Sequence, residues 1–182
     1  MASPSEREIG FATYLKGLAD AENRAALAAL RRGLGKTPGE SADLFPYVVR
    51  WLPDDPWRES AFFLVASLFG LHPASLPVAS DQRRTTNFGA SFRLVADDVA
   101  GAERRFVALL NTHRDDLPEH LRHAVALLKA HDRPIDWAQL LRDVQDWNVP
   151  SRSVQRAWAR EFWRGASGSA AAPNEDIGPV ST

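Results

Sequence analysis

Apolar residues recur along most of this chain at every third or fourth position, the spacing that lines one face of an α-helix. The clearest stripe consists of Leu117, Leu121, Ala124, Val125 and Leu128. No segment alternates apolar and polar residues as a half-buried strand does. The pattern therefore predicts an all-α fold.

Capping signals divide the pattern into short helices. Asp55 directly precedes a proline, which is typical of an N-cap followed by the first helical position. Asp116 with Glu119 and Asp136 with Gln139 have the spacing of a capping box. We expect a bundle of about eight helices, with a short aromatic-rich segment at 44–52. The expected helices cover residues 6–18, 23–34, 55–71, 87–95, 101–112, 117–130, 136–147 and 150–164.

The length and composition fit one domain. The chain has 182 residues, of which 45% are hydrophobic, an ordinary share for a soluble globular protein. We expect a single helical domain over residues 1–165, built of two packed halves at about 6–75 and 85–165. Residues 166–182 are small and polar and include proline, which predicts a disordered tail.

The charge balance does not by itself indicate a polyanion partner. The chain has 22 basic and 23 acidic residues, so any binding surface must be a local patch. Only three basic residues are lysine and 19 are arginine. The planar arginine fork suits phosphate, although GC-rich codon usage would produce the same bias. The positions of the arginines must therefore decide whether the chain has a surface for a polyanion.

Several classes of protein are excluded or disfavoured. The absence of cysteine excludes a disulfide framework, a thiolate zinc site and a cysteine nucleophile. The N-terminus has no apolar signal core. The longest apolar-rich run, residues 61–71, is too short to span a bilayer. We expect a cytoplasmic protein without membrane contact.

Nothing in the sequence forms a convincing catalytic centre. His120 and His123 are three residues apart, but a metal site needs three or four converging ligands. The acidic pairs at 54–55, 97–98 and 115–116 lie at helix starts or in loops, where capping explains them. We therefore expect no enzyme and no cofactor. A metal hydrolase using the two histidines stays open as an alternative that a metal assay would test.

Arg58 is the first candidate for a phosphate contact. It lies in the first turn of its helix, where a cation opposes the helix dipole. Together with free backbone amides at the same helix end it would form a phosphate site. A salt bridge to Asp54, Asp55 or Glu59 would explain the same residue.

A second group lies in a long loop. Arg83 and Arg84 are followed by Thr85, Thr86 and Asn87. Two guanidinium groups with hydroxyl and amide donors suit a phosphate backbone. The alternative is a solvated loop, but long loops in compact domains are often functional.

A third group follows along the next two helices. Arg104 and Arg105 lie one turn before a small residue, with two polar residues one turn after it, which leaves room for a sugar-phosphate backbone. Arg114 follows the end of that helix, and Arg122 projects from the next. For each arginine alone, a solvated face with an intrahelical ion pair is an alternative.

The last expected helix carries a stripe of arginines at every fourth position, namely Arg152, Arg156, Arg160 and Arg164. A stripe with this spacing slants around the helix, because each step falls about 40° past a full turn. It would face nucleic acid, an acidic protein surface, or only solvent. Trp158 and Phe162 lie on another face and are expected to pack inward or against a partner.

Several ordered pieces of the chain resemble one known family. They are PWRESAFFLVASLFG, QRRTTNFGASFRLVA, AERRFVALLNTHRDDLPEHLRHAVALL and IDWAQLLRDVQDW, which together cover about residues 44–147. In order and spacing they look like the small subunit of the type I-E CRISPR surveillance complex, the CasB family of Cascade.

The resemblance implies an all-α, non-catalytic subunit that stabilises an R-loop. Its implied partners are guide RNA and target DNA, the backbone and large subunits of Cascade, and a second copy of itself. Base pairing would then supply the specificity, and the protein would contribute contacts to the nucleic-acid backbone. The residues that match basic positions of the family are Arg31, Arg32, Arg58, Arg83, Arg84, Arg104, Arg105, Arg114 and Arg122. His123 stands where the family often has a basic residue, which weakens the patch around Arg122.

A helical protein–protein adaptor without nucleic-acid contact is the rival hypothesis. Tryptophans are frequent anchors of protein interfaces, and the candidates are Trp51, Trp57, Trp147, Trp158 and Trp163. Salt-insensitive binding to a partner, without crosslinks to DNA or RNA, would favour this alternative.

Overall fold

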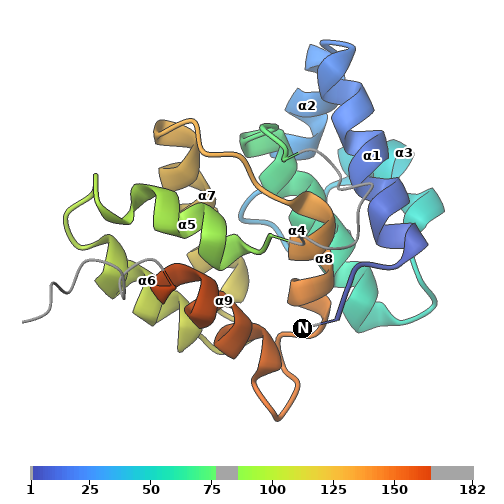
Figure 1. The fold of residues 1–182 in the computed structure, drawn as a ribbon. Helices are drawn as coiled ribbons and strands as arrows, with labels where there is room; N and C mark the ends of the chain where they lie inside the picture. Colours follow the sequence, from blue (N-terminus) through green and yellow to red (C-terminus); the bar gives the residue numbers. More distant parts are fainter. Residues whose placement is uncertain (1, 77–85, 165–182) are drawn as a thin grey trace, which may run out of the picture.

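The computed structural model describes residues 2–76 and 86–164, and these form an all-α fold, as predicted (Figure 1). Within these ranges the only strand-like pairing is an isolated parallel bridge between Ser75 and Ile135. The helices are α1 (Glu6–Asp20), α2 (Arg24–Arg31), α3 (Phe45–Val48), α4 (Pro56–Leu71), α5 (Phe88–Ala96), α6 (Ala102–Leu110), α7 (Leu117–Ala130), α8 (Trp137–Gln145) and α9 (Ser153–Trp163), with short 3-10 helices at Ala42–Leu44 and Val49–Trp51.

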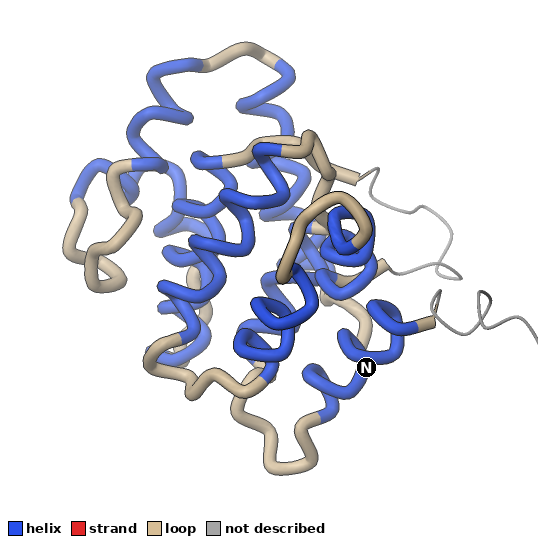
Figure 2. The backbone as a smooth tube through the Cα atoms, turned by 90° about the vertical axis from the view of Figure 1, so that its left-hand side faces the viewer, coloured by secondary structure: helices blue, strands red, loops and turns tan. Residues whose placement is uncertain are grey.

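The helices gather around a central pair, α4 and α8. In Figure 1 the blue helices α1 and α2 and the cyan α3 lie on one side of this pair, and α5, α6 and α9 lie on the other. Helix α2 packs on α4, α5 packs on α9, and both α1 and α4 pack on α8. Figure 2 shows short helices and brief loops throughout the described backbone.

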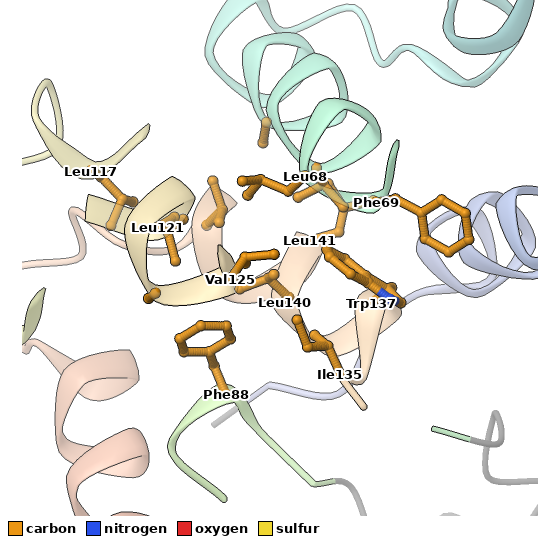
Figure 3. Packing of buried hydrophobic residues seen from close by; sticks show 14 of the residues in the cluster. Leu68, Phe69, Phe88, Leu117, Leu121, Val125, Ile135, Trp137, Leu140 and Leu141 are labelled. Carbon is orange, nitrogen blue, oxygen red and sulfur yellow. The ribbon is translucent and has the colours of Figure 1, made fainter. Parts of the chain in front are cut away.

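The core follows from the apolar stripes. Helix α4 is apolar on nearly every side and is buried over most of its length, as expected for a helix enclosed by others. In Figure 3, Leu68 and Phe69 of α4 approach Trp137 and Leu141 of α8. The rings of Phe69 and Trp137 meet edge to face with centroids 5.4 Å apart. One buried cluster draws on helices from α1 to α9.

Two glycines allow helices to approach closely. A Cβ on Gly89 in α5 would lie 2.1 Å from the carbonyl oxygen of Trp158 in α9. A Cβ on Gly70 in α4 would lie 2.7 Å from the backbone nitrogen of Arg31 at the end of α2. Both contacts are with backbone atoms, so no side-chain rotation would make room for a larger residue.

Helix α8 also carries a buried polar network. Asp143 is 1% exposed and accepts hydrogen bonds from Trp158 Nε1 at 2.6 Å and from Gln139 Nε2 at 2.8 Å. Gln145 donates to the buried carboxylate of Glu8 in α1 at 2.8 Å. Burial raises the pKa of Asp143 to about 7, although the two hydrogen bonds act in the opposite direction.

The capping predictions were right at two helices and wrong at a third. Asp55 accepts hydrogen bonds from the first amides of α4, and Asp136 accepts one from Gln139 in α8. Asp116, however, makes no side-chain cap to α7. Its partner in the expected capping box, Glu119, binds Arg122 instead.

Capping also fails as an explanation for the other acidic pairs. Asp97 pairs with Arg93 at 2.8 Å, Asp98 with Arg133 at 3.2 Å, and Asp115 with His113 at 3.3 Å. Of these acidic pairs, only the one at 54–55 supplies a cap.

Three expectations are not decided by this fold. The division into halves at about 6–75 and 85–165 stays a prediction. The proposed tail at 166–182 lies outside the described residues, and so do Arg83 and Arg84.

Candidate nucleic-acid interface

Arg58 is exposed in the first turn of α4 and pairs with no carboxylate of the described residues. The suggested salt bridges to Asp54, Asp55 or Glu59 are therefore absent from this part of the chain. The expected free amides are also absent. Asp55 Oδ1 accepts the backbone amides of Trp57 at 2.9 Å and Arg58 at 3.0 Å. An anion at this helix end must therefore bind to side chains.

Arg114 lies against the same helix end. Its guanidinium carbon is 3.2 Å from the centroid of the Trp57 ring, well within the range of a cation–π contact. The indole is itself fixed, since Nε1 donates to the carbonyl oxygen of Gln145 at 3.0 Å. The structure thus brings Arg114, from the turn between α6 and α7, beside the residue that precedes Arg58.

A shallow cavity of about 270 Å³ opens next to this stack, between the α6–α7 turn and the α8–α9 loop. Arg114, His113 and Arg152 are among the residues that line it. Arg152 Nη2 donates to the carbonyl oxygen of Leu110 at 2.6 Å, at the C-terminus of α6. Cationic side chains from two separate loops therefore border one hollow.

The predicted stripe on the last helix is shorter than expected. Helix α9 begins at Ser153, and Arg152 precedes it in a left-handed conformation, with φ of 50°. Arg164 pairs with Glu161 at 2.9 Å. Of the four arginines, Arg156 and Arg160 are the two that lie within α9, are exposed and have no carboxylate partner in the described chain.

Arg104 and Arg105 lie on the solvent-exposed side of α6. Both are exposed on α6, and neither pairs with a described carboxylate. Phe106 and Leu109 of the same helix are buried on its opposite side. Thr112, one of the two polar residues that follow the small residue Ala108, donates from its hydroxyl to the carbonyl oxygen of Ala108 at 2.9 Å.

Arg31 and Arg32 have structural partners. Arg31 Nε donates to the carbonyl oxygen of Gly70 at 3.0 Å and ties α2 to α4. Arg32 pairs with Asp43 at 3.2 Å, although both side chains are more than half exposed. Surface pairs of this kind contribute little stability, so Arg32 can still exchange its partner for a phosphate.

Arg122 forms an ion pair within its own helix, which was the alternative to a phosphate contact. It donates from Nε and Nη2 to the two carboxylate oxygens of Glu119. These hydrogen bonds lower the pKa of Glu119 and raise the pKa of Arg122. The pair borders a separate cavity of about 400 Å³, lined partly by residues 33–39 and by acidic Asp115 and Asp116. These surroundings are less favourable for a phosphate than those of Arg58 and Arg114.

The sequence did not reveal the role of Trp57. It was grouped with the possible anchors of a protein interface, but its ring lies beneath Arg114. Trp147 and Trp158 are buried at 2% and 0% exposure and serve the core. The adjacent Trp-Arg pair at 57–58 was visible in the sequence, but nothing there indicated a partner 57 positions further along.

Neither a metal site nor a membrane span is found in the described part of the chain. Residues 2–76 and 86–164 contain no group of three metal-ligating side chains. His123 instead lies 3.2 Å from Glu119. None of the helices in these ranges has the length and apolar character needed to cross a bilayer.

Comparison with known proteins gives a consistent result. Residues 26–163 match the family model of the CRISPR-associated protein Cse2. A CRISPR-associated protein Cse2 from Thermus thermophilus is 37% identical over 164 residues, which cover 88% of this chain and 90% of that protein.

Solved structures agree with this match. The crystal structure of a Cse2-family protein from Thermus thermophilus is similar with a TM-score of 0.74 and 33% identity, covering 86% of this chain and 97% of its own. A chain of a CRISPR RNA-guided surveillance complex is similar with a TM-score of 0.75 and 29% identity, covering 90% of this chain and 95% of its own.

Proposed function

The chain belongs to the Cse2 family of CRISPR-associated proteins, and from this premise we propose that it is the non-catalytic small subunit of a type I-E RNA-guided surveillance complex, Cascade. A similar chain occurs in a solved complex of this kind. The proposed partners are guide RNA, target DNA, the backbone and large subunits, and a second copy of this chain. We also expect the complex to act in the cytoplasm.

Within that complex we propose that the protein braces the R-loop through its surface arginines. The observation that carries this proposal is the arrangement of Arg58 and Arg114. The two cations belong to neighbouring surfaces at the start of α4, and neither pairs with a described carboxylate. Cations without acidic partners are available to phosphates, which dominate the affinity of proteins for nucleic acids.

The other candidate arginines differ in how available they are to phosphates. Arg104 and Arg105 are exposed and unpaired in the described chain, so they are the next candidates for phosphate contacts. Arg31, Arg32 and Arg122 each have a partner within the fold. We therefore expect them to contribute less to binding. Arg83 and Arg84 stay candidates from the sequence alone.

The test is target duplex binding by the guide RNA complex, reconstituted with and without this protein. Omission should lower target affinity and shorten the lifetime of the R-loop. The variant Arg58→Glu with Arg114→Glu should reduce affinity while the helical circular dichroism signal stays intact. The slope of log affinity against log salt should fall by about one unit per lost phosphate contact.

A matched control distinguishes the loss of specific phosphate contacts from the change in the net charge of the protein. Arg7→Glu with Arg24→Glu changes the net charge equally, and both residues are exposed on α1 and α2. This control should retain target affinity. Unchanged affinity of the Arg58 and Arg114 variant at physiological salt would contradict the bracing role. Salt-insensitive partner binding without nucleic-acid crosslinks would then favour the adaptor.

A further inference from the structure

The stack of Arg114 on Trp57 joins three elements at one point. Trp57 belongs to the first turn of α4, Arg114 to the turn between α6 and α7, and Gln145 ends α8. The indole ring is held at its edge by the hydrogen bond from Nε1 to the Gln145 carbonyl oxygen. Its face is covered by the guanidinium, 3.2 Å from the ring centroid. The ring is thus a fixed platform for the cation.

The platform is the main partner that Arg114 has in the described structure. Its Nε is buried and makes no hydrogen bond to the described residues. Its two terminal nitrogens likewise have no hydrogen-bond partner among residues 2–76 and 86–164, yet they are not enclosed. An arginine in this position has lost much of its rotamer freedom while its outer donors remain available. Ordering such a side chain normally opposes binding, and here the fold has already ordered it.

We propose that Trp57 is a positioning residue of the nucleic-acid surface, which holds the guanidinium of Arg114 in the orientation that meets a phosphate diester. This inference rests on the proposed function. Arg58 follows Trp57 by one residue, about 100° further round the helix, so its charge lies beside the stack rather than in it. The two arginines then present separate donors to one strand.

The orientation of the Arg114 guanidinium matters more because the N-terminus of α4 offers no free backbone amide to a phosphate. The backbone amides of Trp57 and Arg58 are already bound by Asp55, and Pro56 has no amide hydrogen. A phosphate near this end of α4 therefore gains its hydrogen bonds from guanidinium groups. A planar fork binds in a bidentate manner only when it faces the phosphate correctly, so a loss of orientation costs affinity without any loss of charge.

The first test compares Trp57→Leu with Trp57→Phe in the reconstituted guide RNA complex. Leucine removes the aromatic face, and we expect target affinity to fall roughly 5- to 30-fold, mainly through faster dissociation. Phenylalanine retains a face and should retain most of the affinity. Trp163→Leu is the matched control, because Trp163 is also half-buried and hydrogen-bonded, at 3.1 Å to Glu103, with no arginine of the described chain on its ring. It should leave affinity unchanged.

The second test distinguishes positioning from a general structural role. If Trp57 acts through Arg114, then Trp57→Leu should have little further effect in a chain that already carries Arg114→Ala. An equal loss of affinity in both backgrounds would overturn the inference. Should Trp57→Leu fail to fold, Arg114→Lys tests the same point, because lysine keeps the charge but not the planar stack. Parental affinity in that variant would also overturn it.

The outcomes separate this inference from the proposed function. Weaker binding by Arg114→Ala with normal binding by Trp57→Leu refutes the positioning role and leaves the bracing role intact. Normal binding by Arg114→Ala, by Arg58→Glu with Arg114→Glu, and by the complex without this protein refutes the proposed function itself.

Discussion

Gly89 occupies the point at which α5 and α9 come closest. Its missing Cβ leaves room for the carbonyl oxygen of Trp158, which would lie 2.1 Å from a methyl group there. A carbonyl in the middle of a helix cannot rotate away without breaking that helix. The two helices must therefore separate if residue 89 gains a side chain.

We expect Gly89→Ala to lower the free energy of unfolding by about 3 kcal/mol, the upper end for overpacking. The matched control is Gly17→Ala in α1, where a Cβ would meet nothing within 4 Å. This control should be stabilising by about 0.5–1 kcal/mol, since alanine favours a helix more than glycine does. Urea denaturation of both variants measures the difference. Equal stability of the two would show that α5 and α9 are not as close as described.

Asp143 gives the fold a dependence on pH that differs from that of surface acids. Its folded pKa, about 7, lies above the ordinary value of 3.8, chiefly because of burial. Neighbouring Asp136 and Asp146 also raise it, while the hydrogen bonds from Trp158 and Gln139 lower it. The folded state therefore binds a proton more readily than the unfolded state, and this residue's contribution to stability falls as pH rises from about 4 to 7.

Asp143→Asn should remove that dependence, because asparagine does not titrate. It should also lose one hydrogen bond, since the amide nitrogen cannot accept from Trp158 or Gln139. The stability advantage of the parent over the variant should be larger at pH 5 than at pH 7.5. Urea denaturation at the two pH values measures this change. An advantage that is the same at both pH values would show that Asp143 is already ionised in the fold at pH 5.

At the scale of elements, α4 depends on its first turn. Asp55 accepts two of the amides that have no partner within the helix. Asp116, at the corresponding position of α7, accepts none. The two residues look equivalent in the sequence but differ in the fold, so they form a natural comparison.

We expect Asp55→Ala to cost about 1 kcal/mol of stability, and Asp116→Ala to cost much less. Thermal melts followed by circular dichroism compare the two. A larger loss from Asp116→Ala would mean that the first turn of α7 is capped in solution after all.

Most elements could be predicted from the sequence, because an amphipathic stripe and a cap are local features. The stripe of α7 and the caps of α4 and α8 are examples. The start of α9 was predicted too early, since Pro150 resembles a first helical residue, yet Arg152 adopts a left-handed conformation before Ser153. The side chain of Arg152 also binds the end of α6. A local pattern contains no information about such a partner.

The candidate site was less predictable for the same reason. The sequence placed arginines at helix starts and turns, but it could not tell which had carboxylate partners. Arg122 and Arg58 looked alike as exposed cations, yet only Arg122 of the two pairs with a carboxylate of the described chain. The stack that joins residues 57 and 114 depends on how α4, α8 and the turn between α6 and α7 pack together.

At the scale of the whole molecule, the core is shared by helices from both ends of the chain. Buried residues of α1 and α9 belong to the same cluster as those of α4 and α8. No described helix buries its apolar face alone. Loss of one helix therefore exposes apolar surface on several others.

We expect the protein to unfold in a single cooperative transition, because the halves share this core. Tryptophan fluorescence and far-ultraviolet circular dichroism should give coincident urea curves. Two separated transitions would show instead that the halves near 6–75 and 85–165 unfold independently.

The hydrogen bond between Glu8 and Gln145 has a consequence for how the molecule is made. The two residues are 137 positions apart, so at about 5–20 residues per second a ribosome needs roughly 7 to 27 s to synthesise the segment between them. During that time α1 is present without α8, the helix whose Gln145 binds the carboxylate of Glu8. Helix α1 therefore completes its packing only after α8 has left the exit tunnel.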